Sequence, residues 1–168
     1  MNKTADGFRI GVLTLSDKGA RGERIDESGP ALVAMCNDLG RVERTGIIPD
    51  DRETIMATLV EWADEYGLDL ILTTGGTGLT PRDVTPEATL AVVDRLVPGM
   101  AEAMRMESLK KTPHAMLSRG VAGLRGETLI VNLPGSPKAA RENFAVLLPA
   151  LPHALGKLKG DPSDCATS

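Results

Sequence analysis

Short apolar runs alternate along this chain with segments in which apolar residues recur at helical spacing. The clearest runs are residues 8–15 (FRIGVLTL), 68–74 (LDLILTT) and 127–133 (ETLIVNL), and residues 41–48 form a weaker one. Runs of this length and composition predict β-strands. Residues 68–74 are continuous enough to indicate a strand buried on both faces, as in a parallel sheet. The alternation therefore predicts an α/β fold, a three-layer α/β/α sandwich around a mostly parallel sheet.

Helices are expected between these strands. Pro30 suits the first turn of one helix, and Gly40 ends it. Further helical segments are expected from Asp50–Asp51 to Gly67, from Thr85–Pro86 onwards, at 100–108, at 114–119, and from 137 to 159 with an interruption near Pro149. The unusual loops all follow strands. In such folds a ligand binds beyond the carboxyl ends of the strands, so a crevice is expected there.

Composition narrows the class of protein. The chain has 168 residues, 42% hydrophobic and only 2% aromatic, with a formal net charge of −4. This length suits one domain, and we expect residues 1–160 to form it and 161–168 to be a flexible tail. The negative charge and the shortage of aromatic residues disfavour nucleic acid and anionic membranes as partners. No apolar run approaches the roughly 20 residues of a membrane span, and Cys36 and Cys165 make no disulfide framework, so a cytoplasmic protein is expected.

The segment after the strand at 68–74 carries the strongest functional signal. Residues 73–89 read TTGGTGLTPRDVTPEAT. The glycines allow a tight turn and leave backbone N–H groups unshielded, and such a nest binds anions, phosphate above all. The segment is not a P-loop, because Leu79 follows Gly78, and not a dinucleotide fingerprint, because Pro81 takes the third glycine position. For the glycines alone, a strand-to-helix turn that needs positive φ is the alternative.

Two aspartates near strand ends are candidates for chemistry. Asp83 is placed to hold Mg²⁺ or to orient a phosphate, and the alternative is a loop aspartate that bonds local N–H groups. Asp50 with Glu53 three residues later resembles a capping box, so spacing alone favours a helix cap. Thr85 is a candidate N-cap before Pro86.

A second wall of the crevice is expected where the strand at 127–133 ends. Residues 134–137 read PGSP, in which Gly135 and Ser136 can present N–H and hydroxyl groups. An ordinary turn explains this segment equally well. Ser118 and Arg119 are polar among apolar neighbours, and they either meet an anionic ligand or end a helix.

These motifs resemble the MogA/MoaB family of molybdenum cofactor biosynthesis, which includes domains of plant Cnx and animal gephyrin proteins. The resemblance covers roughly residues 10–161 and is carried by VLTLSD (12–17), IIPDD (47–51), TTGGTGLTPRDVTPEAT (73–89), the long segment 107–140 and LLPALPHAL (147–155). It implies a molybdopterin adenylyltransferase, a nucleotidyltransferase that joins molybdopterin and Mg-ATP. The reaction releases pyrophosphate and leaves AMP on the terminal phosphate of the pterin. A homotrimer is also implied.

The resemblance assigns roles to particular residues. Asp83 and Asp50 match two family aspartates required for activity, which moves Asp50 from a helix cap to a functional residue. We hypothesise that Asp83, with Asp50, holds the Mg²⁺ that accompanies ATP. The residues expected to bind nucleotide and phosphate are Ser16, Asp17, Thr74, Gly75, Gly76, Thr77, Gly78 and Glu87. Those expected to bind molybdopterin are Ser118, Arg119, Gly135, Ser136 and Pro137.

Two anionic substrates on an acidic chain need local positive charge. We expect it from the glycine loop, a helix N-terminus, Arg82, Arg119 and Mg²⁺. The expected partners are ATP, molybdopterin and a molybdenum insertase that receives the product. Three alternatives stay open: a protein of the same fold that binds molybdopterin without adenylating it, a scaffold protein, and a generic nucleotide-binding domain.

Overall fold

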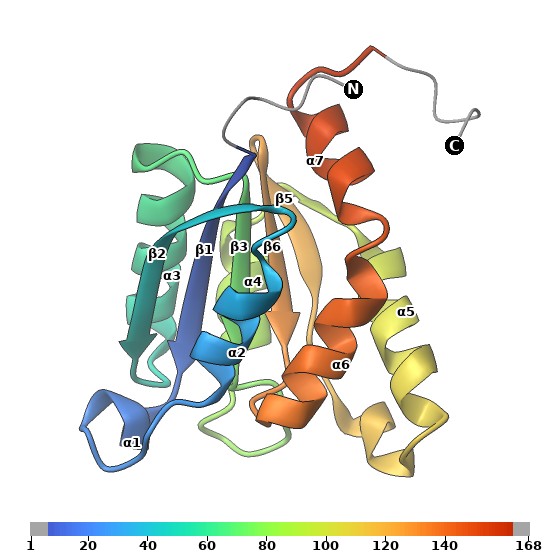
Figure 1. The fold of residues 1–168 in the computed structure, drawn as a ribbon. Helices are drawn as coiled ribbons and strands as arrows, with labels where there is room; N and C mark the ends of the chain where they lie inside the picture. Colours follow the sequence, from blue (N-terminus) through green and yellow to red (C-terminus); the bar gives the residue numbers. More distant parts are fainter. Residues whose placement is uncertain (1–6, 163–168) are drawn as a thin grey trace.

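A six-stranded sheet forms the centre of the protein (Figure 1). The computed structural model describes residues 7–162, so Cys165 and residues 163–168 of the expected tail lie outside the described residues. Across the sheet the order is β2 (Gly40–Ile48), β1 (Phe8–Leu15), β3 (Leu70–Thr74), β6 (Thr128–Leu133), β5 (Ala122–Arg125) and β4 (Arg95–Leu96). The first four strands are parallel, and β5 and β4 pair antiparallel. The expected mostly parallel sheet is confirmed.

Helices cover both faces of this sheet and complete the expected three layers (Figure 1). One face carries α2 (Ser28–Met35), α5 (Pro98–Leu109), α6 (Pro137–Leu147) and α7 (Leu151–Leu158). The other carries α3 (Arg52–Val60), which continues into a π-helical turn at Glu61–Glu65, and α4 (Thr85–Val92). The short α1 (Asp17–Ala20) follows β1, and a 3-10 helix spans Pro113–Leu117. Within residues 7–162, no helix is long and apolar enough to cross a membrane.

Strand residues point alternately into two separate cores. In β1, Ile10 and Val12 pack beneath α2 and α6, whereas Leu13 and Leu15 pack beneath α3. This period of two explains why the apolar runs are continuous, because both faces of the central strands are buried. Gly11 leaves space for Trp62, since a Cβ there would lie 2.6 Å from the indole ring.

The chain order places a ligand crevice at the ends of β1 and β3. From β1 the chain passes through α2 to the edge strand β2, then crosses back through α3 to β3 on the other side of β1. Loops that leave β1 and β3 therefore diverge to opposite sides. At such a switch point the carboxyl ends of the strands leave an open crevice.

The sequence pattern missed the antiparallel edge of the sheet. β4 has only two residues, too few to show a period, and β5 joins β6 through a tight turn at Gly126, whose φ is +53°. Helix α2 begins at Ser28 rather than at Pro30. Helix α3 begins at Arg52, two residues after the expected start. These errors lie at element ends, where local pattern is weakest.

Replacing Phe144 tests the core beneath α6. Its side chain is fully buried, so Phe144→Ala should lower the free energy of unfolding by about 3–5 kcal/mol through lost burial and a residual cavity. Urea denaturation measures the change. Leu79→Ala is the control, because Leu79 is 63% exposed and its loss should cost no more than about 0.5 kcal/mol. Equal effects of the two substitutions would contradict the assigned core.

Candidate functional site

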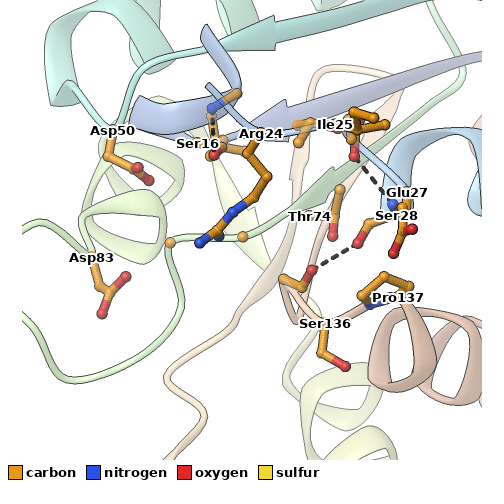
Figure 2. A pocket seen from close by; sticks show the side chains of 17 residues that line it. Ser16, Arg24, Ile25, Glu27, Ser28, Asp50, Thr74, Asp83, Ser136 and Pro137 are labelled. Atoms are coloured by element: carbon orange, nitrogen blue, oxygen red, sulfur yellow. Dashed lines mark hydrogen bonds between the residues drawn. The ribbon is translucent and has the colours of Figure 1, made fainter. Parts of the chain in front are cut away.

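A pocket of about 420 Å³ lies at the carboxyl ends of the parallel strands (Figure 2). Its walls come from the ends of β1, β2, β3 and β6 and from the loop that leads into α2. The sequence-predicted site residues that line it are Ser16, Asp50, Thr74, Gly75, Gly76, Asp83, Gly135, Ser136 and Pro137. Six others are not among its lining residues, namely Asp17, Thr77, Gly78, Glu87, Ser118 and Arg119.

The glycine turn after β3 is wedged between its neighbouring strands. Gly75 has a φ of +103°, and its N–H donates to the carbonyl oxygen of Leu133 at 3.1 Å. A side chain at Gly75 would collide with the carbonyl of Leu15 at the end of β1. Glycine is therefore required here both for the left-handed backbone and for the close approach.

Thr85 holds the same turn from the other side. Its buried hydroxyl donates to the Gly75 carbonyl at 3.0 Å, and its N–H donates to the Gly76 carbonyl at 3.2 Å. The expectation that Thr85 caps α4 is wrong, because Val84 occupies the N-cap position and provides no side-chain cap. A buried hydroxyl needs a partner, and the bent glycine turn supplies the carbonyl.

Asp50 faces the pocket instead of capping α3. The cap is Asp51, whose carboxylate accepts from the Thr54 N–H at 2.9 Å and the Thr54 hydroxyl at 2.6 Å. The expected helix cap at Asp50 is therefore wrong, because the residue that caps α3 is its neighbour Asp51. Asp50 instead pairs with Asp17 reciprocally, each carboxylate accepting from the other's backbone N–H at 3.0 Å. This brace joins the ends of β1 and β2.

The surroundings of Asp50 disfavour its ionised form. Burial raises the pKa of Asp50, and the negative charges of Asp17 and Asp83 raise it further, against the lowering effects of the Asp17 N–H and of Arg82. A carboxylate in such a place is stabilised by an added cation. The electrostatics of the pocket therefore favour a cation beside Asp50.

Asp83 reaches the pocket from the loop before α4 (Figure 2). One of its oxygens accepts from the Thr80 N–H at 2.9 Å and the Thr80 hydroxyl at 2.8 Å, so it makes the local bonds of a loop aspartate and also lines the pocket. Gly78 leaves room for it, because a Cβ there would lie 2.9 Å from that oxygen.

The two pocket aspartates fit a magnesium ion that substrate phosphates also hold. Residues 7–162 contain no group of three or more His, Cys, Asp or Glu side chains able to hold a metal ion. Mg²⁺ in phosphate-transfer sites is commonly bound by one or two carboxylates together with substrate phosphates and water. Asp50 and Asp83 supply that number of carboxylates.

Two serine hydroxyls of the pocket keep a proton to donate. Ser16 and Ser136 accept hydrogen bonds from the backbone N–H groups of Gly19 and Ala139 and thereby cap α1 and α6. A hydroxyl that accepts can still donate, and an anion in the pocket could receive that bond. By contrast, the hydroxyl of Thr74 donates to the carbonyl of Pro134 at 2.7 Å.

Arg82 and Arg119, the expected cations, are engaged elsewhere. Arg82 donates to both carboxylate oxygens of Asp17, at 2.9 and 2.7 Å, and this contact lowers the pKa of Asp17. Arg119 forms an ion pair with Glu87, which lowers the pKa of that glutamate. Neither arginine lines the pocket.

Arg119 instead binds backbone carbonyls of the loop between β3 and α4. Its guanidinium donates to the carbonyls of Gly78, at 2.8 Å, and Asp83, at 2.7 Å. Its backbone N–H donates to the Thr77 carbonyl at 3.0 Å. Arg119 and Glu87 thus position the loop that carries Asp83, which explains why polar residues occur in these segments.

The loop that enters α2 was not foreseen as part of the site. Arg24, Ile25, Asp26, Glu27 and Ser28 all line the pocket. The hydroxyl of Ser28 donates to the Gly135 carbonyl at 2.7 Å and so joins this loop to the end of β6. The available sequence signal was Asp26, two residues before Ser28-Gly29-Pro30, because an aspartate just ahead of a helix commonly accepts from the first N–H groups of that helix.

The fold and the pocket define a doubly wound α/β protein with an open crevice at the carboxyl ends of its parallel strands. Residues 11–153 match the family described as "Probable molybdopterin binding domain", and the chain belongs to that family. It is 44% identical to molybdopterin adenylyltransferase of Helicobacter pylori, covering 92% of this chain and 89% of that protein. Gephyrin of Dictyostelium discoideum is also 44% identical over 95% of this chain, which spans only 24% of gephyrin's length. The solved structure of the molybdopterin biosynthesis enzyme MoaB from Thermus thermophilus has a TM-score of 0.87 at 55% identity, covering 94% of this chain and 99% of that one.

Substitution of Gly76 tests the geometry of the turn. Gly76→Ala should destabilise the protein by about 1–2 kcal/mol for the left-handed backbone and by about 1–3 kcal/mol more for the collision with Thr85. Gly22→Ala is the matched control, since Gly22 has a φ of +73° but open space around it. Urea denaturation compares the two variants. Equal losses of stability would show that the close contact with Thr85 does not constrain the turn.

The pH dependence of stability tests the environment of Asp50. Because its pKa is raised from the ordinary 3.8, the folded protein binds a proton there more tightly than the unfolded chain, and stability falls as pH rises through the window just above that value. Asp50→Asn should therefore gain stability relative to wild type with rising pH.

Asp51→Asn is the control of opposite sign for that measurement. Bonds from Thr54 lower the pKa of Asp51, so its contribution to stability is present at higher pH and is lost as pH falls. The Asp51 variant should therefore lose stability relative to wild type with rising pH. Urea denaturation between pH values below 3.8 and neutral pH measures the stability of each variant relative to wild type. If the two relative stabilities change with pH in the same direction, the opposite pKa shifts assigned to Asp50 and Asp51 are wrong.

Proposed function

We propose that this protein is a molybdopterin adenylyltransferase, which transfers AMP from ATP to the terminal phosphate of molybdopterin and releases pyrophosphate in molybdenum cofactor biosynthesis. The observation that carries the proposal is the placement of Asp50 and Asp83 on one glycine-turn pocket, in a chain that belongs to the molybdopterin-binding family. The relative from Helicobacter pylori, whose length this chain nearly spans, bears that name.

The reaction joins two phosphates that repel each other. An oxygen of the pterin's terminal phosphate attacks the α-phosphorus of ATP, and the bond from that phosphorus to the leaving pyrophosphate breaks. The substrate supplies the nucleophile, so the protein has to align the groups in line and offset their negative charge. We assign donation to the phosphates to the hydroxyls of Ser16 and Ser136, which line the pocket and cap helices.

Asp50 and Asp83 would hold the Mg²⁺ that arrives with ATP. When bound there, the ion would supply charge neutralisation to the phosphate oxygens and to the leaving pyrophosphate. Asp50 is poised for this role because its ionised form is disfavoured without a cation. The brace from Asp17, which accepts from Arg82, keeps the Asp50 carboxylate directed at the pocket.

The proposal extends to the setting of the enzyme. We place it in the cytoplasm as a homotrimer that passes adenylated molybdopterin to a molybdenum insertase, on the resemblance of its motifs to the MogA/MoaB family. Sedimentation equilibrium tests the trimer directly.

The alternative is a protein of the same fold that binds molybdopterin, or serves as a scaffold, without transferring AMP. Incubation with molybdopterin and α-labelled ATP separates these functions. Label on the pterin supports the transferase. Pterin binding without label supports the non-catalytic protein, and the absence of binding to either substrate would refute the proposal.

Asp83→Asn tests the assigned catalytic carboxylate. Adenylation should fall by about 100-fold or more, the usual scale for losing an electrostatic contact made in the transition state. Asp38→Asn is the control and should keep wild-type activity. Asp38 is exposed and lies just before β2, at the amino ends of the parallel strands and away from the pocket. Binding of ATP without Mg²⁺ is measured separately by calorimetry. Near wild-type turnover by Asp83→Asn would contradict the role in metal binding.

A further inference from the structure

The charge of the pocket is opposite to what its ligands require. Among the residues that the structure describes, its lining includes the carboxylates of Asp26, Glu27, Asp50 and Asp83 but a single cationic side chain, Arg24. Even if Mg²⁺ is held by Asp50 and Asp83, phosphate groups elsewhere in the pocket would face two further acidic residues. An arginine in this position therefore decides whether that part of the pocket can accept an anion.

Arg24 is available to a ligand. Within residues 7–162 it forms no hydrogen bond or ion pair, whereas Arg82 and Arg119 are engaged by Asp17 and Glu87. Figure 2 shows its side chain extending into the pocket, with Asp50 and Asp83 on one side of it and Ser28 and Ser136 on the other. An exposed guanidinium with no protein partner keeps its donors for a bound oxyanion.

The backbone that carries Arg24 is anchored on the pocket wall. Two residues on, Asp26 accepts from the Thr14 hydroxyl at 2.7 Å and from the N–H groups of Ser28 and Gly29 at 3.1 and 3.0 Å. These bonds join the loop to β1 and to the start of α2. A side chain at Gly29 would collide with the Asp26 carboxylate, so this anchor requires glycine there.

We propose that Arg24 binds a phosphate group of the substrate in this pocket, as the cationic side chain that its acidic lining otherwise lacks. The identity of the phosphate rests on the proposed function, which offers two sources, the triphosphate of ATP and the terminal phosphate of molybdopterin. A guanidinium suits either source, because its planar donors contact two phosphate oxygens at once.

Three variants test the proposal, Arg24→Ala, Arg24→Lys and the control Arg21→Ala. Arg21 lies three residues earlier, is exposed and pairs with Glu23, and it does not line the pocket. Calorimetry with ATP, AMP and inorganic tripolyphosphate measures phosphate binding, and adenylation kinetics give the KM for molybdopterin. Thermal unfolding confirms that each variant is folded.

Loss of a charged hydrogen bond corresponds to about 10- to 100-fold weaker binding. If Arg24 contacts the nucleotide, Arg24→Ala should lose that much affinity for ATP and tripolyphosphate, and Arg24→Lys should recover part of it. If it contacts the pterin phosphate, those affinities stay unchanged and the KM for molybdopterin rises by a similar factor. Either result supports the proposal, provided that Arg21→Ala matches wild type.

Equal behaviour of Arg24→Ala and Arg21→Ala in every assay would overturn it. Failure of the proposed function can be distinguished from failure of the Arg24 assignment. A wild-type protein that binds tripolyphosphate through Arg24 but transfers no AMP would refute the adenylyltransferase and leave the assignment of Arg24 standing.

Discussion

The site depends on one close contact, the wedging of the glycine turn between the ends of β1 and β6. Gly75 fits there only without a side chain, bonded to the Leu133 carbonyl and packed against that of Leu15. Because the turn is held at this point, the chain leaves β3 in a single direction. Thr85 then ties it to α4. The turn thereby fixes the ends of β1 and β6 and the start of α4 relative to one another.

Around that turn, pairs of charged residues position the carboxylates that face the ligand. Asp17 holds Asp50 and is itself held by Arg82, while Arg119 holds the loop that carries Asp83. These ion pairs are exposed, so their value lies in geometry more than in stability. These pairs engage Arg82 and Arg119, the two arginines that the sequence analysis expected to face the ligand. Among the described residues, Arg24 is the cation that remains on the pocket lining.

Local pattern predicted well where one physical requirement acts alone. Continuous apolar runs predicted the parallel strands, and the glycine run predicted a tight turn with positive φ at Gly75 and Gly76, because burial on two faces and left-handed backbone each leave a clear signal. Prediction failed where two adjacent residues could play the same part. Asp50 and Asp51 are both reasonable caps, and only the end of β2 decides that Asp51 accepts from Thr54.

The sequence by itself determined the fold class, the family motifs and the edge of the sheet where the site lies. Only the tertiary structure decided which charges face the ligand. Periodicity records burial, a property of each residue, whereas an ion pair such as Arg82 with Asp17 joins residues 65 positions apart. The same limit hid Arg24, whose role follows from what the other arginines contact and from the loop that Asp26 anchors.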